Sequence, residues 1–136
     1  MDPLRLHVTP RKTILVVEDD APLRRFYQHT LGAAGYAVVA VEDGVDALRR
    51  IDAGLTPSVV VLDLGLPRLN GFDVHSELMA RPDTHHIPII VVTGLDDQRG
   101  FSDHGFACVL RKPVSPEQIL DSVEECLRQS VLTRLI

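Results

Sequence analysis

Five short apolar runs, each followed by a polar or amphipathic stretch, constrain the fold of this chain more than any other feature. The runs are Thr13–Val17, Ala37–Val41, Val59–Leu62, Ile89–Val92 and Cys108–Leu110. Within each run the apolar residues follow one another instead of alternating with polar ones, which is typical of parallel strands covered on both faces. The pattern predicts an α/β domain with a doubly wound, five-stranded parallel sheet, whose ligand site lies at the carboxyl ends of the strands.

Helical periodicity marks four stretches between and after these runs. Their apolar positions are Leu23, Phe26, Tyr27, Thr30 and Leu31, then Ala47, Leu48 and Ile51, then Phe72, His75, Leu78 and Met79, and finally Ile119, Leu120, Val123, Cys126 and Leu127. Residues at this spacing of three and four form one face of a helix. The last helix has a defined start, because Ser115 can cap it, Pro116 suits the first helical position and Gln118 completes a capping box.

Charge and composition narrow the classes of function. The 136 residues carry a formal net charge of −5 and their Lys and Arg residues are scattered, so we expect no direct nucleic-acid binding. No apolar run approaches the roughly 18 to 20 residues that cross a bilayer, so we expect no membrane contact and a cytoplasmic location. Cys108 and Cys126 have no CxxC spacing and no nearby His, so they are expected to be small apolar residues.

Polar residues follow the ends of four predicted strands. Glu18–Asp20 follow the first run, Asp63 the third, Thr93 the fourth and Lys112 the fifth. Carboxylates held close together repel one another, and a hard cation that prefers oxygen ligands, such as Mg²⁺, relieves that repulsion. With its charge screened, Asp63 can attack an anionic phosphoryl donor as a carboxylate nucleophile. Lys112 and the Thr93 hydroxyl are then suited to bind the phosphoryl oxygens.

These residues lie in motifs that resemble the receiver domains of bacterial response regulators. The match covers about residues 12–128 and rests on ILVVEDD at 14–20, EDGVDAL at 42–48, VVLDLGLPRLNG at 60–71, PIIVVTG at 88–94 and the Lys112-Pro113 pair. The resemblance implies a flavodoxin-like fold with strand order 2-1-3-4-5. It also implies three segments, which are a flexible leader at 1–11, a receiver domain at 12–130 and a C-terminal tail at 131–136.

The resemblance implies a role for each matching acid. Asp63 becomes the phosphoacceptor and a Mg²⁺ ligand. Asp19 becomes a direct ligand of the metal, and Glu18 a ligand that acts through a water molecule. The backbone carbonyl of Gly65 becomes a further ligand, since Mg²⁺ takes oxygen donors and keeps several waters.

The resemblance also implies how such a domain switches and which proteins it meets. Thr93 becomes the hydroxyl that moves toward the phosphoryl group, Lys112 the characteristic lysine, and the Lys112–Pro113 bond a cis peptide. A histidine kinase or a histidine phosphotransfer protein would supply the phosphoryl group, and an unidentified downstream protein would recognise the phosphorylated form, in which a homodimer can also form. Such a domain is a signalling phosphoacceptor, not an enzyme, because it assists only its own phosphorylation and dephosphorylation.

The segment between the fourth and fifth runs departs from the family. It is shorter by roughly one helical turn of three or four residues. Its candidate helical stretch, residues 95–105, contains two glycines and little apolar periodicity, so we expect a short or irregular fourth helix. Val109, three residues before Lys112, stands where the family often has a Tyr or Phe and is too small for the usual ring rotation. We therefore expect the loop at 96–104 to report phosphorylation, with Phe101 or Phe106 as its apolar contact.

Gly65 bears on the main alternative function and on the lifetime of a phosphorylated state. A haloacid-dehalogenase-like phosphatase usually carries a second acid two residues after its nucleophile, and that position here is Gly65. In receivers, Gly65 and Leu95 would flank the path of the attacking water, and a glycine cannot orient it, so we expect slow self-dephosphorylation.

A receiver-like module that only binds a partner typically lacks the Asp, Thr or Lys, and none is missing here. A receiver fragment of a larger hybrid kinase or regulator stays open, because residues 131–136 are apolar for an exposed tail.

Overall fold

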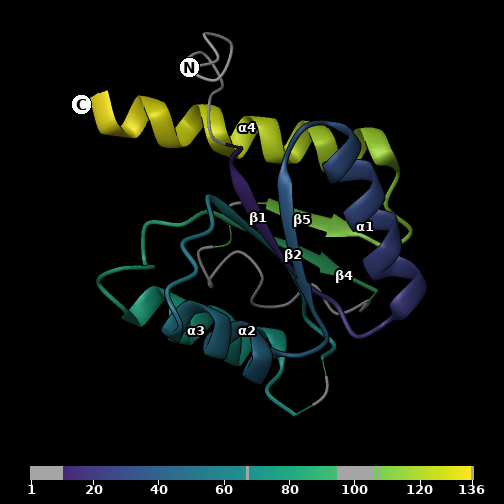
Figure 1. Ribbon diagram of the computed structural model, residues 1–136, viewed down its shortest axis with the longest axis horizontal. Helices are drawn as coiled ribbons and strands as arrows, with labels where there is room; N and C mark the ends of the chain where they lie inside the picture. The colour runs from purple at the N-terminus through teal and green to yellow at the C-terminus, as the bar shows by residue number, and fades with distance from the viewer. Residues whose placement is uncertain (1–10, 67, 95–105, 107, 136) are drawn as a thin grey trace, which may run out of the picture.

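One five-stranded sheet forms the centre of the computed structural model, which describes residues 11–66, 68–94, 106 and 108–135 (Figure 1). Its strands are β1 (Thr13–Val17), β2 (Ala37–Val41), β3 (Val59–Asp63), β4 (Ile89–Thr93) and β5 (Cys108–Arg111). All pairings are parallel, and the strand order is β2-β1-β3-β4-β5. The predicted α/β fold and strand order are therefore confirmed.

Helices cover both faces of this sheet, so the central strands β1, β3 and β4 are buried from both sides. The helices are α1 (Ala21–Ala33), α2 (Gly44–Asp52), α3 (Gly71–Ala80) and α4 (Pro116–Leu135). Figure 1 shows α2 and α3 on one face and α1 and α4 on the other. Alternate residues of the central strands enter the two layers: Leu15 packs in the α2–α3 layer and Val16 in the α1–α4 layer. Both layers bury apolar side chains, which explains the uninterrupted apolar runs.

Side-chain caps fix where the helices begin. The predicted capping box is present, because Ser115 Oγ accepts from the Gln118 N–H at 3.1 Å and Gln118 Oε1 accepts from the Ser115 N–H at 2.8 Å. Asp20 caps α1 by accepting from the Leu23 N–H at 3.1 Å. Asp43 caps α2 in the same way. The caps at Asp20 and Asp43 set the direction in which the chain leaves the ends of β1 and β2.

The C-terminal segment differs from what the sequence led us to expect. Residues 131–135 continue α4 instead of beginning a tail. Val131 and Leu132 are exposed on this last part of the helix. None of the helices in the described part of the chain is long and apolar enough to cross a membrane.

The loop between β4 and β5 is described only in part. Residues 1–10 of the leader expected at 1–11 lie outside the described residues, and so do the expected short fourth helix at 95–105 and Phe101. Phe106 packs edge-on against His75 of α3, with ring centroids 4.6 Å apart, and also lies near Phe72 at 6.2 Å. Val109 is exposed on β5. Phe106 thus connects the end of this loop to α3.

Candidate functional site

The parallel register brings the predicted site residues to one edge of the sheet. Across neighbouring strands, Val17 is level with Leu62, Asp63 with Val92, and Thr93 with Arg111. Glu18 follows β1 directly and Lys112 follows β5 directly, so both lie at this edge. The Lys112 N–H donates to the Thr93 carbonyl at 2.9 Å, which holds the chain to β4 where β5 ends. The edge is the carboxyl end of the strands, where ligands bind in open α/β sheets.

Three carboxyl groups meet at this edge. One oxygen from each of Glu18, Asp19 and Asp63 lies within 4.8 Å of the others. Glu18 and Asp63 are buried, whereas Asp19 is exposed. Apart from an ion pair with Lys112, the oxygens of Glu18 have no hydrogen-bond partner among the described residues. Buried carboxylate oxygens without donors are costly, and a compact set of oxygen ligands fits Mg²⁺.

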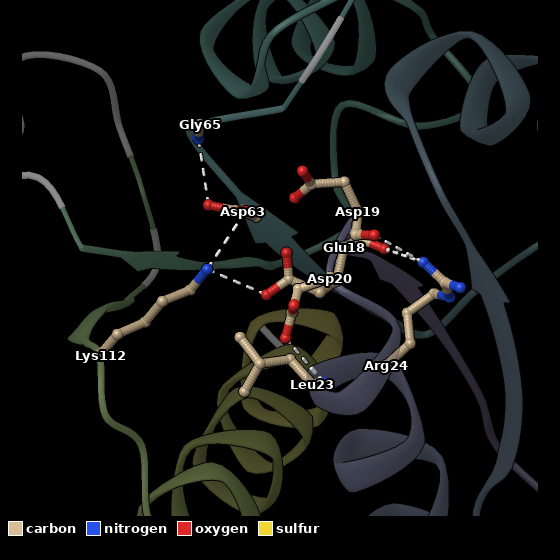
Figure 2. Close-up of polar contacts among 8 residues, drawn as sticks. All are labelled: Glu18, Asp19, Asp20, Leu23, Arg24, Asp63, Gly65 and Lys112. Atoms are coloured by element: carbon tan, nitrogen blue, oxygen red, sulfur yellow. Dashed lines mark hydrogen bonds and ion pairs between the residues drawn. The ribbon is translucent and has the colours of Figure 1, made fainter.

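Lys112 connects the two buried acids. Its Nζ donates a hydrogen bond to Asp63 Oδ2 at 3.2 Å and forms an ion pair with Glu18 Oε1 at 3.0 Å. Figure 2 shows its side chain reaching toward both carboxyl groups. Burial would lower the pKa of Lys112, but the contacts with Glu18 and Asp63 outweigh burial and raise that pKa. The ammonium group therefore stays charged within the site.

The two buried acids have opposite pKa shifts. Burial, followed by the neighbouring Asp63 carboxyl, raises the pKa of Glu18 to about 8. Burial would also raise the pKa of Asp63, but contacts with Glu18, the Gly65 N–H and Lys112 outweigh burial and lower it. The difference has a structural cause, because Asp63 accepts hydrogen bonds from Gly65 at 3.0 Å and from Lys112 at 3.2 Å. These shifts favour the ionised form of Asp63 and, when no cation is bound, the protonated form of Glu18.

The remaining predicted residues are close to this centre. Thr93 is the last residue of β4 and is completely buried. The Lys112–Pro113 peptide bond is cis. The contact made by Gly65 is through its N–H, which binds Asp63, so a role for its carbonyl remains a prediction. Asp20 takes no part in the group of three acids, because its side chain caps α1.

Sequence reasoning missed Arg24, which contacts the acidic segment directly. Its Nη1 donates to the carbonyl oxygens of Glu18 and Asp19, both at 3.0 Å. The ion pair between Arg68 and Asp43 was also missed. The available signals were weak, since an Arg in the first turns of a helix or in a loop is usually a solvated side chain.

Most of this chain matches a known protein family. The profile of the family described as "Response regulator receiver domain" matches residues 14–124. This chain belongs to the response regulator receiver domain family. Receiver domains are signalling domains of two-component systems, and they interact with histidine kinases and with downstream effectors. The family binds Mg²⁺ at an acidic site, and the acids that meet here are Glu18, Asp19 and Asp63.

The curated relatives of this receiver domain are longer proteins. Response regulator MprA of Mycobacterium sp. (strain KMS) is 37% identical over 120 residues, which are 86% of this chain and 51% of the relative. Probable transcriptional regulator ycf27 of Porphyridium aerugineum is 34% identical over 127 residues, which are 88% of this chain and 49% of the relative. The chain thus spans about half the length of these relatives.

Solved structures similar to this receiver domain include a chemotaxis response regulator and the receiver domain of a sensor histidine kinase. The chemotaxis response regulator CheY4 of Vibrio cholerae has a TM-score of 0.80 and 26% identity, covering 87% of this chain and 100% of that chain. The receiver domain of sensor histidine kinase PA1611 from Pseudomonas aeruginosa has a TM-score of 0.79 and 25% identity, covering 87% and 98%. The PA1611 receiver has a magnesium ion coordinated in its active site cleft.

Proposed function

We propose that this receiver domain accepts a phosphoryl group on Asp63 from a histidine kinase or a histidine phosphotransfer protein, and that the modification changes which downstream protein it binds. One observation supports this most directly. Asp63 is a buried carboxyl group with a lowered pKa, 3.2 Å from the ammonium of Lys112 and grouped with two further acids. A buried acid kept ionised at the end of a strand is suited to nucleophilic attack on phosphorus.

Mg²⁺ is the cofactor that the acidic group fits. We infer that Asp19 and Asp63 bind it directly, that Glu18 does so through water, and that the Gly65 carbonyl is a further ligand. Two features support this assignment: among the described residues the Glu18 oxygens have no partner other than Lys112, and the three acids are arranged compactly. The ion coordinated in the active site cleft of the PA1611 receiver supports it independently. When bound, Mg²⁺ would neutralise the carboxylates and the incoming phosphoryl oxygens, whose charges otherwise repel.

Side chains of the domain itself would then carry out the phosphoryl transfer. An oxygen of Asp63 forms the new bond to phosphorus as the bond from phosphorus to the donor's histidine nitrogen breaks, and that nitrogen keeps the electron pair. Lys112 already lies beside Asp63, so its ammonium needs little movement to bind a phosphoryl oxygen. The Thr93 hydroxyl, at the end of the neighbouring strand, would donate to another. The product is an acyl phosphate on Asp63.

Phosphorylation by a small-molecule donor tests the proposal without the cognate kinase. The wild-type chain is incubated with acetyl phosphate and Mg²⁺ and its intact mass is measured. We expect one alkali-labile phosphoryl group on the wild type and none on Asp63→Asn, which keeps the shape of the side chain but removes the nucleophile. Asp20→Asn is the matched control, since asparagine also caps helices and Asp20 lies outside the acidic group. Phosphorylation of Asp63→Asn to the same extent would contradict the assignment.

A further inference from the structure

Arg24 binds the backbone that carries two of the proposed metal ligands. It lies in the first turns of α1, directly after the acidic segment. One amino group of its guanidinium, Nη1, donates to the Glu18 carbonyl at 3.0 Å and to the Asp19 carbonyl at 3.0 Å. In Figure 2 the guanidinium approaches these carbonyls from the side opposite Lys112. Arg24 thus contacts the main chain of Glu18 and Asp19, whereas Lys112 contacts the side chain of Glu18.

These carbonyls lie where the sheet stops supplying hydrogen-bond partners. The Glu18 N–H still donates to the Val41 carbonyl at 3.1 Å, but β1 ends at Val17. A backbone carbonyl in a partly buried position needs a donor, and a single arginine amino group with two N–H bonds can serve two adjacent acceptors. The Arg24 side chain is only 19% exposed. Its hydrogen bond to the Glu18 carbonyl is partly buried, whereas the one to the Asp19 carbonyl is exposed.

The acidic segment is therefore held from several directions. The Val41 carbonyl accepts from the Glu18 N–H, and the Asp20 side chain accepts from the Leu23 N–H at 3.1 Å. Arg24 binds the two carbonyls between these contacts. Its Nη2 also lies 3.6 Å from Glu42 Oε1, which ties the guanidinium to the residue following β2. Rotation of the peptide that joins Glu18 to Asp19 would break at least one of these bonds.

We propose that Arg24 is a positioning residue for the metal site, acting through the Glu18–Asp19 peptide. Fixing this peptide fixes the directions in which the Glu18 and Asp19 side chains leave the backbone. The three acids converge only if both directions are kept. This inference rests on the proposed function, because it assigns Arg24 to the same Mg²⁺ site. Removal of outer partners that orient metal ligands typically weakens metal binding by about 10-fold to 100-fold.

Mg²⁺ titrations of the full chain, followed by ¹⁵N–¹H NMR shifts, test this role. Arg24→Met keeps the length and the apolar stem of the side chain and removes all its donors. We expect it to bind Mg²⁺ at least about 10-fold more weakly than the wild type. Arg25→Met is the matched control, because Arg25 is the next residue of α1 and is exposed, and it should keep the wild-type affinity. Urea unfolding in metal-free buffer, measured in parallel, separates a loss of stability from a loss of affinity in the folded protein.

The outcomes separate the role of Arg24 from the proposed function of the domain. Wild-type Mg²⁺ affinity in folded Arg24→Met would overturn the role of Arg24 and leave the proposed function intact. Absence of Mg²⁺ binding by the wild-type chain would overturn the proposed function, and this inference with it. If Arg24→Met does not fold, Arg24→Lys is the test, since it keeps the charge but not the planar amino group that reaches both carbonyls. It should bind Mg²⁺ several-fold more weakly than the wild type, and equal affinity would overturn the inference.

Discussion

The ammonium nitrogen of Lys112 lies 3.0 Å from Glu18 Oε1 and 3.2 Å from Asp63 Oδ2, so it is close to both acids. A single positive charge thus serves two buried carboxyl groups and cannot compensate both. Burial, followed by the neighbouring Asp63 carboxyl, raises the pKa of Glu18 to about 8, while the pKa of Asp63 falls below its ordinary value. A divalent cation at this place would satisfy both acids and leave Lys112 available to bind phosphoryl oxygens.

Replacing Lys112 should separate metal binding from phosphoryl transfer. We expect Lys112→Met to slow phosphorylation by acetyl phosphate by about 100-fold, the usual scale for losing one preorganised donor. Mg²⁺ should bind this variant at least as tightly as the wild type, because a neighbouring positive charge has been removed. Stopped reactions analysed by intact mass give the rate, and an NMR titration gives the affinity. A wild-type rate of phosphorylation in Lys112→Met would show that the lysine does not contact the transferred group.

Mg²⁺ should stabilise the folded chain by mass action, through Asp19. The wild-type Tm is expected to rise with Mg²⁺ concentration, because the acids converge only in the folded state. Asp19→Ala should remove most of this rise while changing the Tm little in metal-free buffer, since Asp19 is exposed. Thermal unfolding followed by circular dichroism measures both quantities. An equal Mg²⁺-dependent rise in the two proteins would place the ion elsewhere.

Gly65 should make the phosphorylated state long-lived. Among the described residues, a Cβ at this position would have only Asp63 Oδ1 within 4 Å, at 3.8 Å, so it would not displace their backbone. Gly65→Asn adds an amide that can orient a water molecule toward phosphorus, and we expect it to shorten the lifetime of the acyl phosphate severalfold. Loss of the phosphorylated mass after donor removal gives the lifetime. Hydrolysis of the wild type within seconds in Mg²⁺ buffer would contradict the expectation of slow dephosphorylation.

Much of the site could be predicted from the sequence, because the sheet itself brings the residues together. Uninterrupted apolar runs mark buried parallel strands, and the carboxyl ends of parallel strands meet at one edge. That rule alone places Asp63, Thr93 and Lys112 near one another, as the structure does.

Features that depend on loop geometry could not be predicted in the same way. Arg24 lies on a helix like any surface arginine, and only the path of the chain after β1 brings it onto two carbonyls. The extension of α4 to Leu135 was also missed, because an apolar stretch such as Val131-Leu132 does not distinguish an exposed helix end from a tail. Phe106 was proposed as an apolar contact of the β4–β5 loop without a partner, and the structure provides His75 as that partner.

Gly71 is the first residue of α3 and lies against the end of β3. A Cβ on Gly71 would lie 2.4 Å from the Asp63 carbonyl oxygen and 2.6 Å from Leu64 Cα, distances that backbone atoms cannot tolerate without moving. The Gly71 N–H also donates to the Leu64 carbonyl at 3.2 Å, which ties the helix to the strand end. Gly71→Ala must therefore push α3 away from the residues that orient Asp63. We expect a loss of about 1–3 kcal/mol in the free energy of unfolding, as for overpacked cores, together with slower phosphorylation of the folded variant.

Gly32→Ala is the matched control for this substitution. Gly32 is also helical, lies in α1 and is exposed, and a Cβ there would have no atom of another described part of the chain within 4 Å. Alanine should stabilise this site by about 0.5–1 kcal/mol, because a glycine within a helix loses more conformational freedom on folding. Urea unfolding of the two variants should thus give changes of opposite sign, and phosphorylation by acetyl phosphate should fall only in Gly71→Ala. Equal stability and equal phosphorylation rates for Gly71→Ala and the wild type would mean that α3 does not constrain Asp63 through this close contact.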